Sequence, residues 1–183
     1  IIKEKHHVSF PFYFEYENNH FISVESAQDG CVSIYKVQEE ITKWKLEKKI
    51  FIDSLKEPID PIIFYFDNLW WLIVSEGYCD LNNEMYIFYS ENPINSKWEE
   101  HSKNPIYINQ YSRNGGFIKK GDKHYRVSQI SGFDNYGKKI CLREINLLTK
   151  NNFNEKSIQS IHSGFSSSAK GVHTFTAIDE LTA

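Results

Sequence analysis

Polar residues with useful chemistry stand at the starts of several apolar, strand-like runs: Asp60 before Pro61, Arg113 and Asn114 before Gly115, and His173 before Thr174. A carboxylate accepts hydrogen bonds or a proton, and a guanidinium binds carboxylate or phosphate through two parallel hydrogen bonds. An amide donates and accepts hydrogen bonds but delivers no proton at neutral pH. Gathered at one place, such groups could hold a polar or anionic small molecule without breaking a bond in it. Arg126 and Gln129 lie a little further along and are added to this predicted ligand-binding set.

Each of these residues also has a purely structural interpretation. Asp60 could shape a turn at the edge of a strand, and Arg113 could form a salt bridge between neighbouring units. His173 could be a buried histidine with satisfied hydrogen bonds, or could bind a structural cation through a water. Arg126 and Gln129 could pack within their own sheet. The sequence leaves both interpretations open.

No motif indicates a nucleophile, a phosphate loop or a metal. A Gly-x-Ser-x-Gly turn and a glycine-rich phosphate loop are both absent from the sequence. The three cysteines, Cys31, Cys79 and Cys141, lie far apart and lack zinc-ligand spacing, so we interpret them as small buried apolar residues. We therefore expect no metal ion and no cofactor.

The composition indicates an all-β fold. Of 183 residues, 40% are apolar, and thirteen Phe, eleven Tyr and four Trp make this apolar content unusually aromatic. Aromatic residues suit half-buried strands, whereas the good helix formers Ala and Leu are scarce. A chain of this length is expected to bury one core.

Charge and hydropathy argue against nucleic acid and membrane-spanning roles for this segment. The net charge is −3, and eighteen of the 21 basic residues are lysines dispersed among acidic residues. No apolar run approaches the ~18–20 residues that span a bilayer. The chain starts without Met or an apolar signal region, which suggests a piece of a larger protein. A cytoplasmic location, or a soluble part of a membrane-associated protein, is favoured.

A repeat of about fifty residues is the strongest pattern in the chain. Corresponding strand starts fall at Phe12, Ile62, Phe117 and His173, separated by 50, 55 and 56 positions. In each unit two apolar runs flank a short polar turn, which predicts a β-hairpin, and two further strand-like runs follow. The predicted units are 8–52, 59–108 and 112–162, with a partial unit at 171–183.

Four short strands per unit predict the blades of a β-propeller, because each small sheet buries its faces only against its neighbours. An antiparallel sandwich also has short strands at regular spacing but predicts no fifty-residue recurrence. Three blades and the start of another cannot close a ring of four to eight, so we expect an incomplete propeller. Trp44 and Trp98 are predicted to anchor the packing between blades.

Several short motifs resemble one family in order and spacing across nearly the whole chain. They are His7–Phe12, Asp60–Ile62, Trp70–Leu72, Asn104–Ile106, Ser112–Gly116, Tyr125–Gln129, Tyr136–Gly137 and His173–Thr174. The family is that of propeller domains N-terminal to the transferase in plant glucosamine inositolphosphorylceramide transferases, also fused to formyltransferase-like proteins in bacteria. The resemblance is specific for the domain and says little about a reaction.

The resemblance extends to the five-bladed propellers of glycoside hydrolase families 43 and 32. It implies a propeller of the five-bladed type, incomplete here. It also implies an active site in the axial funnel, with an Asp base, an orienting Asp and a Glu acid on different blades. Asp60 matches the orienting Asp, so it is the one catalytic candidate if the protein is hydrolase-like. Asn114 stands where those hydrolases carry the acid, and an amide cannot act as that acid.

The sequence therefore predicts a non-hydrolytic, carbohydrate- or glycoconjugate-associated propeller, accessory to a covalently attached glycosyltransferase or formyltransferase-like enzyme. The expected ligand is a sugar, a sugar phosphate or a glycoconjugate, bound by Asp60, Arg113, Asn114, Arg126, Gln129 and His173. Catalysis by this segment alone is not expected. Two alternatives remain: a glycoside hydrolase with part of its catalytic set elsewhere, and a protein-interaction propeller whose funnel lacks convergent polar groups.

Overall fold

The computed structural model describes residues 2, 4–77, 83–132, 135–165 and 171–175, and these form an almost entirely β structure. Two single-turn 3₁₀ helices, Ala27–Asp29 and Ser163–Phe165, accompany the strands. The strands are β1 (Ser9–Tyr16), β2 (Asn19–Ser26), β3 (Cys31–Val37), β4 (Trp44–Phe51), β5 (Pro58–Phe66), β6 (Leu69–Glu76), β7 (Glu84–Ser90), β8 (Glu99–Glu100), β9 (Tyr107–Ile108), β10 (Asn114–Lys120), β11 (Lys123–Gly132), β12 (Asn135–Leu148) and β13 (Phe153–His162).

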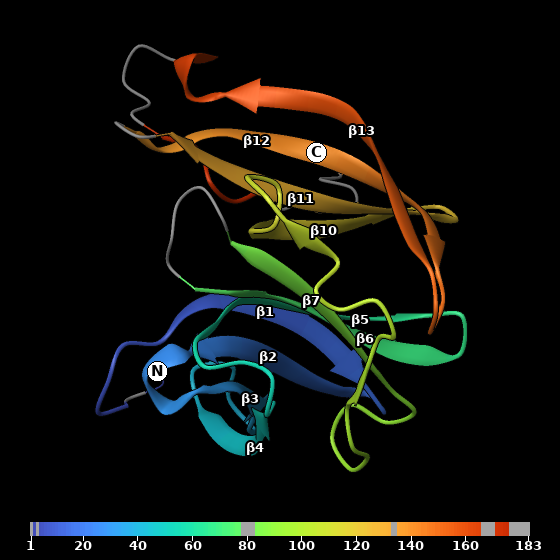
Figure 1. The fold of residues 1–183 in the computed structure, drawn as a ribbon. Helices are drawn as coiled ribbons and strands as arrows, with labels where there is room; N and C mark the ends of the chain where they lie inside the picture. The colour runs from blue at the N-terminus through green and yellow to red at the C-terminus, as the bar shows by residue number, and fades with distance from the viewer. Residues whose placement is uncertain (1, 3, 78–82, 133–134, 166–170, 176–183) are drawn as a thin grey trace.

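The strands form three antiparallel sheets in chain order. The first sheet is β1-β2-β3-β4, the second is β5-β6-β7-β8 with β9 also paired to β7, and the third is β10-β11-β12-β13. Figure 1 shows the second sheet lying between the other two. The first strand of the second sheet, β5, contacts both β1 and β10. This arrangement confirms the predicted all-β fold and the incomplete propeller.

Tight hairpins join the first two strands of each sheet, as the turn residues predict. The β1–β2 turn places Glu17 and Asn18 at φ of 49° and 58°, and the β5–β6 turn places Asp67 and Asn68 at 48° and 61°. Two successive residues with positive φ give a type I′ turn, whose twist matches that of the strands it joins.

The second sheet is buried on both faces, because successive residues of a strand point to opposite sides. Trp70 packs with Phe14 in the core between the first and second sheets. Its neighbour Trp71 belongs to the core that the second sheet shares with the third, where Phe64 stacks on Phe117 with ring centroids 4.1 Å apart. Strand β6 thereby contributes side chains to both cores.

A β-bulge interrupts the beginning of the first strand of each sheet, which we call the innermost strand: β1, β5 and β10. The strand register shifts between Ser9 and Phe12, between Ile59 and Ile62, and between Asn114 and Gly116. Phe10, Asp60 and Gly116 have φ of 50°, 52° and 138° at these places. A bulge bends the strand and redirects the side chain beside it. The three bulges therefore share a position that turns residues toward the meeting point of β1, β5 and β10.

Several smaller predictions can be placed on the structure. Trp98 is 7% exposed and lies in the core between the first two sheets, as predicted. Trp44 is half-buried and instead lines a surface hollow beside Tyr13 and Ile41. Cys31 and Cys141 are buried free thiols, whereas Cys79 lies outside the described residues.

The start of the predicted fourth unit is described only as far as residue 175. Residues 171–175 are not assigned to a strand, and residues 176–183 lie outside the described part of the chain. The Val172 amide donates to the Gly137 carbonyl at 2.7 Å, and the Phe175 amide donates to the Gly115 carbonyl at 2.9 Å. The segment is thereby held against the third sheet. Within the described ranges, no helix is long and apolar enough to cross a bilayer.

Candidate functional site

The candidate site lies where the innermost strands begin, and Asp60 is at its centre. The bulge at the start of β5 places Asp60 among residues of all three sheets, and Asp60 is only 2% exposed. A buried carboxylate is costly unless it is paired and hydrogen-bonded. Its surroundings must therefore supply several donors.

The third sheet and the loop before it supply most of these donors. Arg113 pairs with Asp60 through two hydrogen bonds, Nε to Oδ2 at 2.8 Å and Nη2 to Oδ1 at 3.2 Å. Gln129 Nε2 donates to the same Oδ2 at 3.0 Å. Both carboxylate oxygens of Asp60 are therefore occupied, and the pair links the second sheet to the third.

The first sheet enters the site through Glu25, near the end of β2. Glu25 is 6% exposed, and its Oε2 accepts a 2.9 Å hydrogen bond from the backbone amide of Asp60. Its Oε1 accepts a hydrogen bond from the Ser9 hydroxyl. Glu25 thus adds a second buried carboxylate to the site.

The charges of Asp60 and Arg113 are strongly influenced by burial and by each other. Burial raises the pKa of Asp60 to about 6, although the Arg113 guanidinium and the Gln129 hydrogen bond act in the opposite direction. Burial also opposes the charge on Arg113, but the neighbouring Asp60 holds the pKa of that guanidinium above its ordinary value. Because pH 7 lies above the pKa of Asp60 and below that of Arg113, the pair is ionised at that pH.

We predict that the Asp60 carboxyl titrates with a midpoint near pH 6, measurable from its ¹³C chemical shift. Because this folded-state pKa lies above the ordinary 3.8, the folded protein binds the proton more tightly than the unfolded chain. The contribution of Asp60 to the free energy of unfolding therefore falls as the pH rises from about 4 to about 6. In Arg113→Met the midpoint should move higher, since the guanidinium lowers it. A midpoint near 3.8 in the wild type, or a lower midpoint in the variant, would contradict this account.

Asn114 and Arg126, both predicted as ligand contacts, are fully buried behind this pair. Asn114 Nδ2 donates to the Asp60 carbonyl at 2.8 Å and to the Ile73 carbonyl at 3.2 Å. Its Oδ1 accepts from Arg126 Nη1 at 3.1 Å. Arg126 is in turn held by Glu155, with Nε to Oε2 at 2.9 Å and Nη2 to Oε1 at 2.5 Å. In this structure Asn114 holds the backbone of Asp60, and Arg126 holds Asn114.

A pocket of about 530 Å³ lies beside the Asp60–Arg113 ion pair. Its walls come from all three sheets and from the 171–175 segment: His7, Ser9, Phe10, Pro11, Glu25, Asp60, Arg113, Gln129, Tyr136, His173 and Thr174. Four predicted residues, Asp60, Arg113, Gln129 and His173, are thereby brought together. The Arg113 guanidinium lies 5.7 Å from the Tyr136 ring centre, and the Tyr136 and His173 rings are 5.3 Å apart.

Sequence reasoning missed Ser9, Glu25 and Tyr136 as pocket residues. Tyr136 lay within a recognised motif without receiving a role. Glu25 and Gln129 occupy corresponding positions on β2 and β11. Glu25 pairs with Ser9 just before the bulge of the first sheet. The backbone amide of Gln129 donates to the Arg113 carbonyl just before the bulge of the third sheet. Aligning the second strands of the repeats would have placed Glu25 beside the predicted set.

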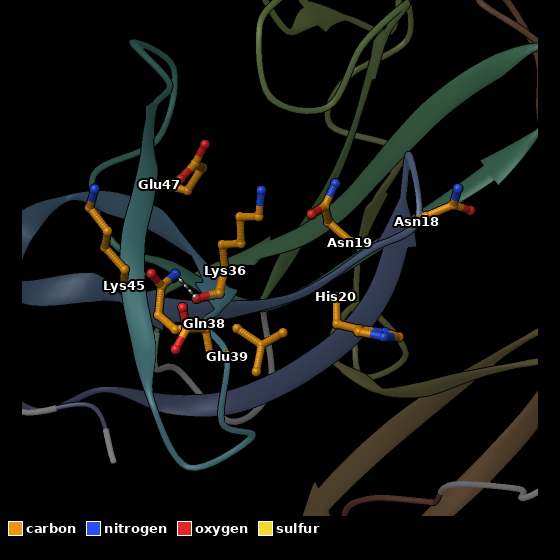
Figure 2. A pocket seen from close by; sticks show the side chains of 9 residues that line it. Asn18, Asn19, His20, Lys36, Gln38, Glu39, Lys45 and Glu47 are labelled. Carbon is orange, nitrogen blue, oxygen red and sulfur yellow. Dashed lines mark hydrogen bonds between the residues drawn. The ribbon is translucent and has the colours of Figure 1, made fainter.

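A second hollow, of about 500 Å³, lies on the outer part of the first sheet. Figure 2 shows its polar side chains, with Gln38 donating to the Lys36 carbonyl at 3.2 Å. Most of its residues are exposed, among them Asn18, Lys45 and Glu47. Exposed flexible side chains give weak, solvent-screened contacts, so the pocket at Asp60 is the better candidate. Within the described ranges, no group of three or more His, Cys, Asp or Glu residues could hold a metal ion.

Comparison with solved structures shows the same fold in glycoside hydrolases. A thermostable family-43 glycoside hydrolase superimposes with a TM-score of 0.62 and 13% identity, covering 85% of this chain and 59% of that one. The endo-arabinase of Bacteroides thetaiotaomicron gives 0.61 and 12%, covering 90% and 61%. A family 117 glycoside hydrolase of Zobellia galactanivorans gives 0.59 and 12%, covering 82% and 45%. At such identities the likeness concerns the fold alone.

Sequence comparison gives a more specific relationship. Glucosamine inositolphosphorylceramide transferase 1 of Arabidopsis thaliana is 37% identical over 163 residues, and that of Oryza sativa subsp. japonica is 36% identical over 162. The alignments cover 84% of this chain but only 20% and 21% of these proteins, so the chain spans about a fifth of their length. The family model described as "Glucosamine inositolphosphorylceramide transferase 1, N-terminal" matches residues 1–180, and the chain therefore belongs to this glycosyltransferase-related family of N-terminal domains.

Proposed function

We propose that this chain is a carbohydrate-binding propeller module accessory to a glycosyltransferase, and that it holds the sugar part of a glycoconjugate in the pocket at Asp60. The observation that carries the proposal is the convergence of polar and aromatic side chains from three sheets on one cavity. Binding sites for small ligands combine a concave surface with a few well-placed polar groups. The family relationship places the domain in a glycosyltransferase context.

The pocket walls suit a sugar ring. Tyr136 is 53% exposed and lies beside His173, so their rings could cover an apolar ring face. Arg113, Glu25 and Gln129 line the same cavity and could hydrogen-bond hydroxyl groups. A neutral hexose would require no compensating charge in the pocket.

The hydrogen bonds around the two carboxylates favour holding a sugar over cutting it. Asp60 uses both oxygens to accept from Arg113 and Gln129, and Glu25 uses both to accept from Ser9 and the Asp60 amide. Inverting hydrolysis requires one carboxyl group facing the leaving oxygen and another facing a water. Two carboxylates already engaged by the protein are poorly prepared for those roles.

Glycan-array screening and calorimetry on the full-length protein test the proposal. We predict that His173→Ala weakens binding of a captured glycan about fivefold or more, because it removes an aromatic wall and a polar group. The matched control is His20→Ala, in the hollow of Figure 2, which should leave binding unchanged. Absence of binding to every saccharide, or equal effects of the two variants, would refute the proposal.

A glycoside hydrolase is the second candidate, favoured by the presence of Asp60 and Glu25 in one pocket. Hydrolysis of aryl glycosides by the full-length protein, lost in Asp60→Asn, would support it. The protein-interaction alternative predicts no convergent polar groups, whereas this pocket contains several.

A further inference from the structure

One residue of the pocket wall carries a buried acceptor that has no partner in the described part of the chain. Gln129 lines the cavity, is 2% exposed, and its Oε1 has no hydrogen-bond partner among the described residues. The amide orientation is fixed, because Nε2 donates to Asp60 Oδ2 at 3.0 Å and to the Asn114 carbonyl at 2.8 Å. A buried acceptor without a partner is costly, so a donor that reaches Oε1 is favoured.

Arg113, the guanidinium that the described residues contribute to the pocket wall, is already engaged. Arg113 directs Nε and Nη2 to Asp60 and lies against the Tyr136 ring. A phosphate group that recruited Arg113 would compete with this bidentate pair and would lie beside a carboxylate. The arginine that the sequence offered for anion binding is therefore poorly available for it.

Carboxylates outnumber guanidinium groups among the described residues of the pocket wall. Asp60 and Glu25 oppose the single guanidinium of Arg113, so these three side chains leave one negative charge. Glu25 is 6% exposed, and its hydrogen bonds come from neutral donors, the Ser9 hydroxyl and the Asp60 amide. In a partly enclosed pocket such a charge repels an anion over several ångströms.

We propose that the pocket selects a non-anionic saccharide that presents hydroxyl or amine donors to Gln129 Oε1 and Glu25, and that it rejects phosphorylated sugars. This inference rests on the proposed sugar binding and narrows its ligand class. Recognition follows from the excess of acceptors, since a donor-bearing ring satisfies them and a phosphate adds further acceptors.

The test is calorimetry on the full-length protein with methyl glycosides of glucose, galactose and mannose, the matching hexose 6-phosphates, and inorganic phosphate. At least one neutral hexose should bind about tenfold or more tightly than its 6-phosphate, and inorganic phosphate should not compete. A 6-phosphate that binds as tightly as its neutral partner overturns the inference. If no saccharide binds, the proposed function itself fails, which is a separate result.

Two further measurements assign the selectivity to named groups. Glu25→Gln should reduce the preference for the neutral sugar to about threefold or less, whereas the control Glu47→Gln, an exposed carboxylate in the other hollow, should keep it. Adding the neutral hexose should shift the ¹³Cδ resonance of Gln129 in the wild type. An unchanged preference in Glu25→Gln or an unmoved Gln129 resonance would overturn the assignment.

Discussion

Glu155→Gln is expected to lower the free energy of unfolding by about 3–5 kcal/mol, the range for removing one partner of a buried ion pair. The side chains of Glu155 and Arg126 are both 0% exposed and are joined by two hydrogen bonds. Glu155 Oε1 also accepts from Arg143 Nε at 2.5 Å. Neutralising Glu155 therefore leaves one guanidinium wholly buried and a second largely buried without their counter-charge. Urea denaturation followed by tryptophan fluorescence measures the change.

A matched substitution in the same sheet separates burial from charge. Glu144 pairs with Lys123 at 2.7 Å, but Lys123 is 62% exposed. Glu144→Gln removes the same charge from a solvated pair and should cost less than about 1 kcal/mol. Similar losses in the two variants would show that the buried network around Arg126 contributes no special stability.

Glu155→Gln should also disturb the pocket, through Arg126 and Asn114. Arg126 holds Asn114, and Asn114 holds the backbone carbonyl of Asp60. We expect Glu155→Gln to change the chemical shifts of Asp60 and Arg113, although the described hydrogen bonds of Glu155 come from Arg126 and Arg143. Such a change would identify Asn114 and Arg126 as positioning residues of the site.

Gly116→Ala is the second change with a large expected effect, a loss of about 2–4 kcal/mol in the free energy of unfolding. Gly116 has a φ of 138°, which side-chain-bearing residues rarely adopt, and an added Cβ would lie 2.4 Å from the Phe175 carbonyl oxygen. The least costly relief is separation of the 171–175 segment from β10. His173 would leave the pocket with that segment.

Hydrogen exchange reports this separation directly. The Phe175 amide donates to the Gly115 carbonyl, so its exchange should become about thirtyfold faster or more in Gly116→Ala. Gly164→Ala is the control, because nothing lies within 4 Å of the added Cβ and its φ is outside the strained range. Unchanged Phe175 protection in Gly116→Ala would mean that the segment tolerates the added methyl group.

The repeat and its hairpins could be predicted from the sequence because they depend on local pattern. The two further strand-like runs predicted in the first unit are present as β3 and β4. Alternation fixes which residues share a face of a strand, and Asn or Asp residues tolerate the positive φ of a tight turn. The structure adds that the adjacent residues Trp70 and Trp71 are both buried, one on each face of β6.

The candidate site, unlike the repeat, could be predicted only in part from the sequence. Residue types marked Asp60, Arg113 and His173, because a polar group at a strand start is visible in the sequence alone. Gln129 was added from a position further along the third hairpin. Which of them face a cavity depends on three bulges and on how the sheets pack. Only that packing brings Glu25 to the amide of Asp60, 35 positions later, and places Asn114 and Arg126 behind the wall. Local pattern determines each blade, whereas contacts between blades, which join residues far apart in the chain, decide what the pocket contains.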